Sequence, residues 1–210
     1  MLRQLIIAAA LALPVSAAAQ DTAPAPAPSK KTDYVRTVAP FDHVEGSADA
    51  PHTMIVYASN MCPHCREWFN DEWPTVKETL VETGQLRLVF RPLPTEPAQL
   101  SMIGFLLAEC DGDNYFARME NQFQRQPEIL KLSKTGGLRE YYPEMAKDYG
   151  LDDVDAMNVC LSNRENLSRI MDHGDRYEAL GIRGVPAFVL NGKAYKGPHK
   201  AKDFVAMLAE

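Results

Sequence analysis

Hydrophobic positions divide the chain into a strand-rich beginning, a helical middle and a second strand-rich part. Residues 53–58 and 86–91 are apolar, β-branched runs with the length of buried strands. Between them a helical pattern covers residues 62–83, and Pro74 is expected to kink or break it near Trp73. A strand, a helix and a second strand in this order predict a parallel pair of strands joined by a crossover helix.

From residue 97 to about residue 181, apolar residues recur at helical spacing almost throughout. The predicted helices cover residues 101–108, 114–124, 138–149, 152–161 and 166–180. Strand character returns at residues 185–190, and Asn191-Gly192 is typical of a two-residue hairpin before a return strand at 193–196. A last helix is expected at residues 200–208. The pattern therefore predicts a strand–helix unit interrupted by a helical insertion.

The first residues have the composition of an export signal. Arg3 supplies a positive charge, residues 5–13 are apolar, and residues 17–19 form a small-residue cleavage pattern. We expect residues 1–19 to be a signal peptide. The alternative is an uncleaved membrane anchor, but the apolar run is shorter than the about 20 residues that span a bilayer. Ala-Pro repeats then predict an extended linker over residues 20–36.

Charge and compartment narrow the classes of partner. The 210-residue chain carries 22 Lys and Arg against 28 Asp and Glu, which gives a net charge of −6. No basic run follows Lys30-Lys31, so neither nucleic acid nor an anionic membrane surface is an expected partner. Export places the four cysteines in an oxidising compartment, where disulfides persist. We therefore interpret them as two potential pairs, namely Cys62 with Cys65 and Cys110 with Cys160.

The motif Cys62-Pro63-His64-Cys65 carries the strongest chemical signal. It follows a buried strand and opens a helix, where the helix dipole and unpaired N–H groups favour thiolate over thiol. Cys62 is then the exposed nucleophile, and Cys65, one turn further, is the buried resolving thiol. His64 offers an N–H or a positive charge to the thiolate, and Pro63 stiffens the helix start. These four residues are the expected catalytic group.

A metal site is the alternative interpretation of the same cysteines, because their spacing suits a metal ion as well as a disulfide. The sequence contains no second Cys-x-x-Cys and no pair of histidines at zinc-finger spacing. Met61, beside the motif, is a soft ligand suited to copper or zinc. We expect no resident metal ion and no other cofactor.

Four stretches share a pattern with one known family: residues 49–51, residues 57–59 followed by the Cys-Pro-His-Cys motif, residues 90–94, and residues 184–192 around Val185-Pro186. In these stretches the chain resembles the DsbA-type periplasmic thiol:disulfide oxidoreductases, from about residue 41 to its end. The resemblance implies an α/β architecture, a thioredoxin-like fold with an inserted all-helical domain. The two parts of the thioredoxin-like domain are then expected at residues 37–96 and 176–210, with the helical insertion at residues 97–175.

The resemblance also implies a function. Cys-Pro-His-Cys combined with Val-Pro is typical of the oxidase branch, which donates its disulfide to folding exported proteins in the periplasm and is reoxidised by a membrane oxidase of the DsbB type. It further implies that Val185–Pro186 is a cis bond, so that Val185 faces an extended substrate and Pro186 packs against the disulfide. We expect a monomer. An isomerase or reductase with the same fold, or a periplasmic metal-binding module, are the alternatives.

Two further expectations concern the interior. Val56 stands where relatives have a buried acid that helps to move protons, so the proton of Cys65 needs water or another group. Cys110 and Cys160 fall on predicted helices of the insertion, where some relatives have a structural disulfide. We favour this disulfide, which would stabilise the fold by about 4 kcal/mol on the disputed chain-entropy model. Two buried free thiols are the alternative.

Overall fold

A computed structural model describes residues 34–110 and 114–208. In these residues five strands form one mixed sheet in the order β1-β3-β2-β4-β5. The strands are β1 His43–Glu45, β2 His52–Ala58, β3 Leu86–Pro92, β4 Ala187–Leu190 and β5 Lys193–Tyr195. The predicted parallel pair is confirmed, because β2 runs parallel to β3 with Val56 opposite Phe90. All other neighbours in the sheet are antiparallel.

Strand β1 was not predicted from the sequence pattern. Its residues pair antiparallel with β3, with Val44 opposite Val89. Val44 is the only apolar residue of the three, and its side chain is 39% exposed. The strand therefore owes its conformation to backbone pairing with β3, which a single-sequence hydrophobic pattern does not record.

The crossover between β2 and β3 alternates α-helical and π-helical turns. Helix α1 spans Pro63–Glu67 and α2 spans Trp73–Val76, and each is followed by a π-helical turn, Trp68–Glu72 and Lys77–Val81. Pro74 has no N–H to donate to a carbonyl one turn earlier. At this point the N–H of Trp73 donates to the carbonyl of Trp68, five residues back. The interruption expected near Trp73 is thus a widened turn, and the helix continues beyond it.

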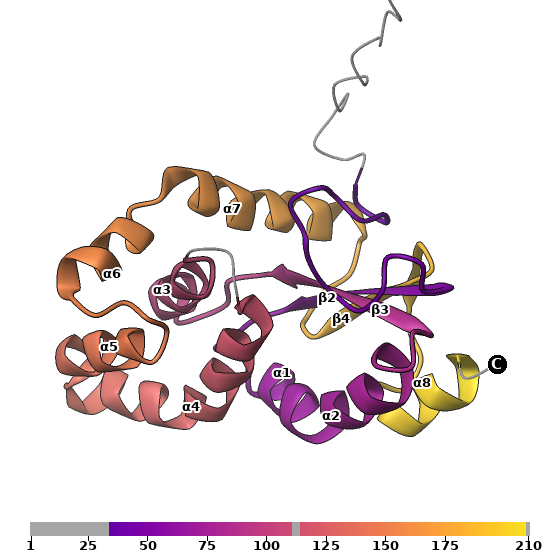
Figure 1. Ribbon diagram of the computed structural model, residues 1–210, viewed down its shortest axis with the longest axis horizontal. Coiled ribbons are helices and arrows are strands. Elements are labelled where there is room, and N and C mark those ends of the chain that lie inside the picture. Colours follow the sequence, from indigo (N-terminus) through magenta and orange to yellow (C-terminus); the bar gives the residue numbers. More distant parts are fainter. Residues whose placement is uncertain (1–33, 111–113, 209–210) are drawn as a thin grey trace, which may run out of the picture.

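Five helices lie between β3 and β4, and one more closes the described chain. They are α3 Ala98–Ala108, α4 Tyr115–Thr135, α5 Leu138–Lys147, α6 Val154–Leu161, α7 Arg164–Ala179 and the last helix, α8 Ala201–Leu208. The expected helices are all present, although α4 continues past the expected end at residue 124 and through Pro127. Figure 1 shows α3, α4, α5 and α6 gathered to one side of the sheet.

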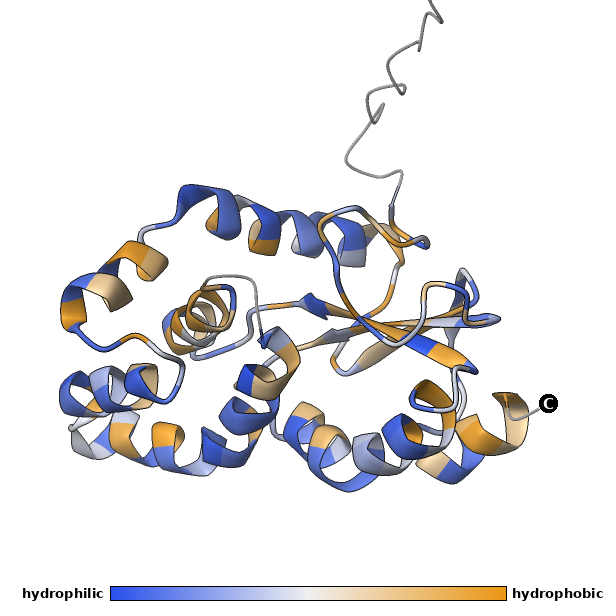
Figure 2. Ribbon diagram, in the orientation of Figure 1, coloured by the Kyte–Doolittle hydropathy of each residue, from blue (hydrophilic) through white to orange (hydrophobic). Residues whose placement is uncertain are grey.

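The sheet separates two hydrophobic layers. Helices α1, α2 and α8 cover one face and α7 covers the other (Figure 1). The first layer is dominated by aromatic side chains, including Trp68, Phe69, Phe90, Phe188 and Phe204. The second contains Ile55, Tyr57 and Val189 with Tyr177 and Leu180 from the α7 side. Figure 2 shows α7 as hydrophilic on its outer side, which is the pattern of a helix that covers a core.

A third hydrophobic cluster fills the insertion and reaches the end of β2. Its members come from α3, α4, α5 and α6, and include Leu107, Ile129, Met145 and Met157. Met61, from the turn after β2, belongs to the same cluster and is 2% exposed. The insertion is therefore packed directly against the segment that carries the cysteine motif.

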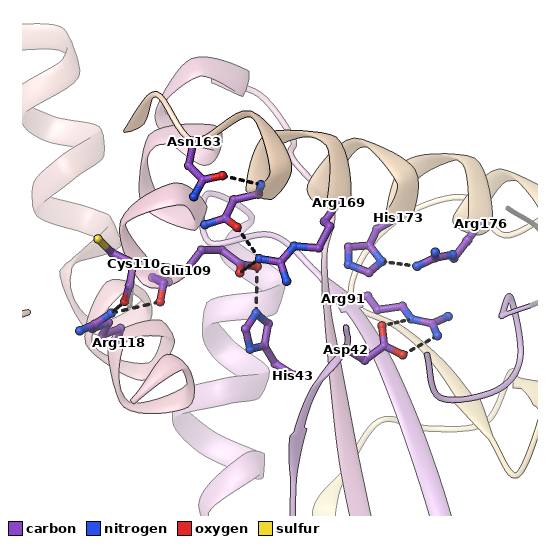
Figure 3. A network of polar contacts seen from close by, with 12 residues as sticks. Asp42, His43, Arg91, Glu109, Cys110, Arg118, Asn163, Arg169, His173 and Arg176 are labelled. Atoms are coloured by element: carbon purple, nitrogen blue, oxygen red, sulfur yellow. Dashed lines mark hydrogen bonds and ion pairs between the residues drawn. The ribbon is translucent and has the colours of Figure 1, made fainter. Parts of the chain in front are cut away.

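The described chain begins in contact with the sheet. Val35 is buried, and its carbonyl accepts hydrogen bonds from the Tyr57 hydroxyl at 3.4 Å and from Arg91 at 3.1 Å. Arg91 also forms a fully buried ion pair with Asp42 at 2.8 Å, which Figure 3 shows. Residues 34–36, assigned to the linker by composition, thus touch the fold. The predicted signal peptide and residues 20–33 of the predicted linker lie outside the described residues.

Candidate active site

The cysteine motif occupies the turn between β2 and α1. Cys62 is the N-cap residue of α1, with extended backbone angles (φ −86°, ψ 121°), and Pro63 is the first helical residue. Proline suits this position because its missing N–H would have no partner in the helix. The N–H of Cys62 donates to the carbonyl of Ser59 at 3.2 Å, which closes the turn. The helix start expected from the sequence is therefore present.

The two cysteines of the motif have different surroundings. Both are free cysteines in the structure; Cys65 is fully buried and Cys62 is half-buried. The Cys62 thiol lies 3.5 Å from the carbonyl oxygen of Val185. The sulfur of Cys65 accepts a hydrogen bond from the backbone N–H of Ser59 at 3.4 Å. Only Cys62 is accessible to another thiol, as the order of the motif suggested.

Electrostatics separate the two thiols further. A hydrogen bond from the Cys65 side chain is the largest influence on Cys62, and with the N–H groups of Cys65 and His64 it lowers the pKa of Cys62 to about 6. The charge of His64 acts in the same direction, and burial opposes it. Burial, reinforced by the neighbouring Cys62, raises the pKa of Cys65 far above its ordinary value. At neutral pH the pair therefore combines a thiolate with a thiol.

His64 lowers the pKa of Cys62 through its backbone N–H and, to a smaller extent, through its charge. Its side chain is 79% exposed, and Nδ1 lies 3.2 Å from the carboxylate of Glu67. The ring is thus directed to solvent and to a neighbour on its own helix, while the His64 backbone N–H faces the sulfur of Cys62. Backbone N–H groups at the helix start therefore act on the thiolate more strongly than the imidazole ring does.

Val185 lies beside Cys62 although the two residues are more than a hundred positions apart in sequence. Strand β4 starts directly after Pro186 and pairs with β2, with Ala187 opposite Tyr57. The Val185–Pro186 peptide bond is cis, as the resemblance implied. The hydroxyl of Tyr177 donates to the carbonyl of Gly184 at 2.7 Å and ties this loop to α7. Sheet pairing and one side-chain hydrogen bond therefore position the loop.

A groove of about 560 Å³ runs past His64 and the Val185–Pro186 bond. Its lining combines aromatic with charged side chains, among them Trp68, Tyr195, Glu67, Asp71, Arg183 and Lys200. Trp68 is nearly buried and donates from its indole nitrogen to the carbonyl of His199 at 2.8 Å, which fixes one wall.

The interior behind Cys65 is apolar where the resemblance led us to look for an acid. Val56 is fully buried and belongs to the same hydrophobic cluster as Cys65.

Among the described residues, no three His, Cys, Asp or Glu side chains are grouped so that they could hold a metal ion. Met61, considered above as a soft ligand, is 2% exposed and packs in the core of the insertion.

The second cysteine pair forms a disulfide away from the groove. Cys110 and Cys160 are joined, with their Cα atoms 5.4 Å apart and a separation of 50 positions in sequence. Cys160 lies on α6, as expected. The helical assignment of Cys110 was wrong, because α3 ends at Ala108 and Cys110 follows in a turn. The disulfide therefore joins this turn to α6.

Buried charges surround the second disulfide. His43 and Arg169 both point toward the carboxylate of Glu109, at 2.9 and 3.1 Å, and the Arg118 guanidinium donates to the carbonyl of Cys110 (Figure 3). The Glu109 side chain is 4% exposed. This network connects β1, the end of α3 and α7. The second cysteine pair thus lies beside contacts that hold three elements of the fold together.

Sequence reasoning missed a group of buried polar side chains under the motif. Ser59, Asn60, Ser101 and Gln122 are fully buried, and Gln126 is 2% exposed. A signal was available, because Gln122 and Gln126 lie one turn apart on the face of α4 that also carries Met119 and Phe123. Polar residues on a core face require partners. Here the partners include other side chains of the group and the backbone carbonyls of Asn60 and Cys62.

Comparison with known proteins places this site in a family. A family model described as Thioredoxin matches residues 39–210. The chain belongs to the thioredoxin family. Its curated relatives include the Na+/H+ antiporter NhaA 1 of Salinispora arenicola, 30% identical over 162 residues, and disulfide bond formation protein D of Bacillus subtilis, 21% identical over 156 residues. The match to the antiporter covers 75% of this chain but only 23% of the antiporter's own length. The match to the Bacillus protein covers 73% of this chain and 69% of that protein.

Solved structures agree on the fold. The chain superposes on Wolbachia pipientis alpha-DsbA1 with a TM-score of 0.72 and 24% identity, covering 82% of this chain and 91% of that one. BdbD from Bacillus subtilis superposes with a TM-score of 0.64 and 18% sequence identity, covering 79% of this chain and 90% of that one. The expected thioredoxin-like fold with a helical insertion is therefore confirmed. No helix within residues 34–110 or 114–208 is both long and apolar enough to cross a membrane.

Proposed function

We propose that this protein is a thiol:disulfide oxidoreductase that donates a Cys62–Cys65 disulfide to folding exported proteins. The observation that carries the proposal is the asymmetry of the pair, with an accessible Cys62 of pKa about 6 beside a buried Cys65 whose pKa is raised. A thiolate of this kind is a good leaving group. It also stabilises the reduced pair relative to the disulfide, which favours release of the disulfide to a substrate.

The reaction proceeds in two balanced exchanges. A substrate thiolate attacks the sulfur of Cys62, the Cys62–Cys65 bond breaks, and Cys65 leaves with the electron pair and takes up a proton. A second substrate thiolate then attacks the substrate sulfur of the mixed disulfide and expels the Cys62 thiolate. The substrate loses two electrons and two protons and gains a disulfide; the enzyme keeps both electrons and one proton, as the Cys62 thiolate and the Cys65 thiol, and the second proton passes to solvent.

Substrate recognition is assigned to the groove and to the Val185–Pro186 loop. The carbonyl of Val185 lies 3.5 Å from the Cys62 sulfur, so a chain bound to Cys62 passes along this backbone. An extended segment can pair with exposed backbone groups and place side chains in a groove. Cysteine-containing exported proteins are therefore the proposed substrates, with the mixed disulfide formed at Cys62.

Localisation and reoxidation complete the proposal. The composition of residues 1–19 favours export, and the periplasm is the compartment in which a disulfide donor would act. The reduced protein would be reoxidised by a membrane oxidase of the DsbB type, and the protein would act as a monomer. Isomerase or reductase activity with the same fold is the competing function, since one neighbouring structure is titled protein-disulfide isomerase, at 17% identity.

Two substrates separate oxidase from isomerase. The oxidised protein is mixed with a reduced, unfolded protein that needs several disulfides, and the reduced protein with the same substrate carrying scrambled disulfides. We expect rapid loss of free thiols in the first mixture and slow recovery of native activity in the second. Slow loss of free thiols in the first mixture with rapid recovery of native activity in the second would mean that the protein is an isomerase. Tight stoichiometric binding of added zinc or copper without thiol loss would favour a metal-binding module.

A further inference from the structure

The buried polar side chains under the motif form one connected network. Its members come from the turn after β2, from α3 and from α4. The Asn60 side-chain amide donates to Gln122 Oε1 at 2.8 Å and to the carbonyl of Ser101 at 3.1 Å. The Ser101 hydroxyl donates back to Asn60 Oδ1 at 2.7 Å, and the Gln122 amide donates to the carbonyl of Gly104 at 2.7 Å. Each of these amides has its partners, which makes the network a rigid unit.

Gln126 connects this region to the reactive cysteine. Both hydrogens of its side-chain nitrogen are used, one toward the carbonyl of Asn60 at 2.7 Å and one toward the carbonyl of Cys62 at 3.0 Å. The Cys62 carbonyl also accepts the N–H of Arg66 at 3.1 Å, the first bond of α1. One side-chain amide of the insertion therefore holds two backbone carbonyls of the active-site turn, those of Asn60 and Cys62.

Close packing fixes the position of the amides. A Cβ atom on Gly104 would collide with the side-chain amides of Asn60 and Gln122, so α3 approaches the network as closely as a helix can. Met61, between the two carbonyls bonded by Gln126, is itself 2% exposed. The turn thus has little room to shift unless α3 and α4 shift with it.

We propose that Gln126 is a positioning residue for Cys62: the helical insertion uses its amide to hold the peptide group at the start of α1, and so aims the Cys62 sulfur for exchange. The inference rests on the proposed function of the pair. Its physical basis is that the Cys62 sulfur is stabilised by the backbone N–H groups of His64 and Cys65, whose direction depends on the Cys62–Pro63 peptide.

A matched pair of variants tests this role. Gln126→Met and Gln122→Met each remove one amide from the same network, but only Gln126 contacts Cys62. For Gln126→Met we expect the pKa of Cys62 to rise by about one unit, measured from the ultraviolet absorbance of the thiolate, because one hydrogen bond at the helix start is lost. The equilibrium of the pair with glutathione should move about tenfold toward the disulfide. For Gln122→Met we expect lower thermal stability with both readouts unchanged.

The outcomes are distinguishable from failure of the proposed function. An unchanged pKa of Cys62 in Gln126→Met, or equal changes in both variants, would overturn the inference and leave Gln126 a packing residue. If Gln126→Met does not fold, Gln126→Ala leaves space for water to reach the two carbonyls, and we expect a smaller rise of the same pKa. If the wild-type protein fails to oxidise a reduced substrate, the proposed function is wrong, while the pKa comparison still decides the role of Gln126.

Discussion

The two cysteine pairs of this protein share a chemistry and differ in what surrounds their sulfur atoms. Cys62 and Cys65 sit at a helix start, one accessible and one buried, next to backbone N–H groups and the Val185 carbonyl. Cys110 and Cys160 join the turn after α3 to α6 across 50 residues, next to the buried Glu109 network. The first pair has unequal thiols, whereas the second closes a long loop.

We infer from this contrast that reactivity depends on the asymmetric surroundings of a cysteine pair more than on the cysteines themselves. A thiolate needs exposure and stabilisation to attack or leave, and a resolving thiol needs burial beside it. A structural disulfide needs neither, and its effect falls mainly on the unfolded chain. The two pairs can therefore be separated by experiment, because changes in one should affect exchange and changes in the other stability.

The largest expected effect is on exchange, from Cys62→Ser. The hydroxyl cannot form the mixed disulfide, so we expect complete loss of substrate oxidation with an unchanged circular dichroism spectrum. The matched control is Cys160→Ser, which should retain oxidation by the Cys62–Cys65 pair. Oxidation by Cys62→Ser at even a tenth of the wild-type rate would mean that the second pair, or another group, carries the reaction.

The largest expected effect on stability comes from the double variant Cys110→Ala/Cys160→Ala. The chain-entropy model gives about 4 kcal/mol for a loop of this length, and losses of about 2–5 kcal/mol are usual for native disulfides. Urea unfolding, with Cys62 and Cys65 kept oxidised, measures the difference. The glutathione equilibrium of Cys62–Cys65 should stay within about twofold of wild type. A larger change would show that the two pairs are coupled through the insertion.

A smaller effect separates the groups that stabilise the Cys62 thiolate. Cys65→Ala removes the hydrogen-bond donor with the largest influence on Cys62, while His64→Ala keeps the His64 backbone N–H and removes only an exposed ring. We expect both variants to raise the pKa of Cys62, and Cys65→Ala to raise it more. Titration of the thiolate absorbance checks the order. A larger rise in His64→Ala would show that the imidazole, and not the Cys65 side chain, is the main group that stabilises the Cys62 thiolate.

The smallest effect is the pH dependence of stability in the reduced protein. The pKa of Cys62 falls from an ordinary value of 9.0 to about 6 on folding, so its ionisation stabilises the reduced fold above the ordinary value, and this stabilisation is lost as the pH falls toward 6. We expect the reduced protein to lose stability relative to the oxidised one between about pH 8 and about pH 6. Denaturant midpoints of both forms measure this. Parallel curves would contradict the low pKa.

Much of the fold was predictable because its elements are long and strongly patterned. The buried strands at residues 53–58 and 86–91 and the helices of the insertion all follow hydrophobic periodicity, and β2 and β3 form the expected parallel pair. The motif was recognisable because a strand precedes it and a helix follows it. The position of Val185-Pro186 came from the family resemblance, since periodicity does not bring residues 185 and 62 together.

The features that were not predicted depend on tertiary contacts, which the local sequence pattern indicates only weakly. Strand β1 has three residues and depends on β3. The sequence does not show that the ring of His64 turns toward Glu67. Gln126 lies on the apolar face of α4, and only the fold shows that its amide meets the Cys62 carbonyl. Such contacts join segments far apart in the chain, beyond the reach of local pattern.

The central claim is that the asymmetric surroundings of Cys62 and Cys65 make their disulfide a donor. Its most direct test is the reduction potential of this pair, measured by equilibration with glutathione in the Cys110→Ala/Cys160→Ala background so that only one pair titrates. We expect a value clearly above the about −270 mV of thioredoxin, at least as high as the about −180 mV of protein disulfide isomerase. A value near that of thioredoxin would contradict the account, because the pair would then hold its disulfide too strongly to donate it.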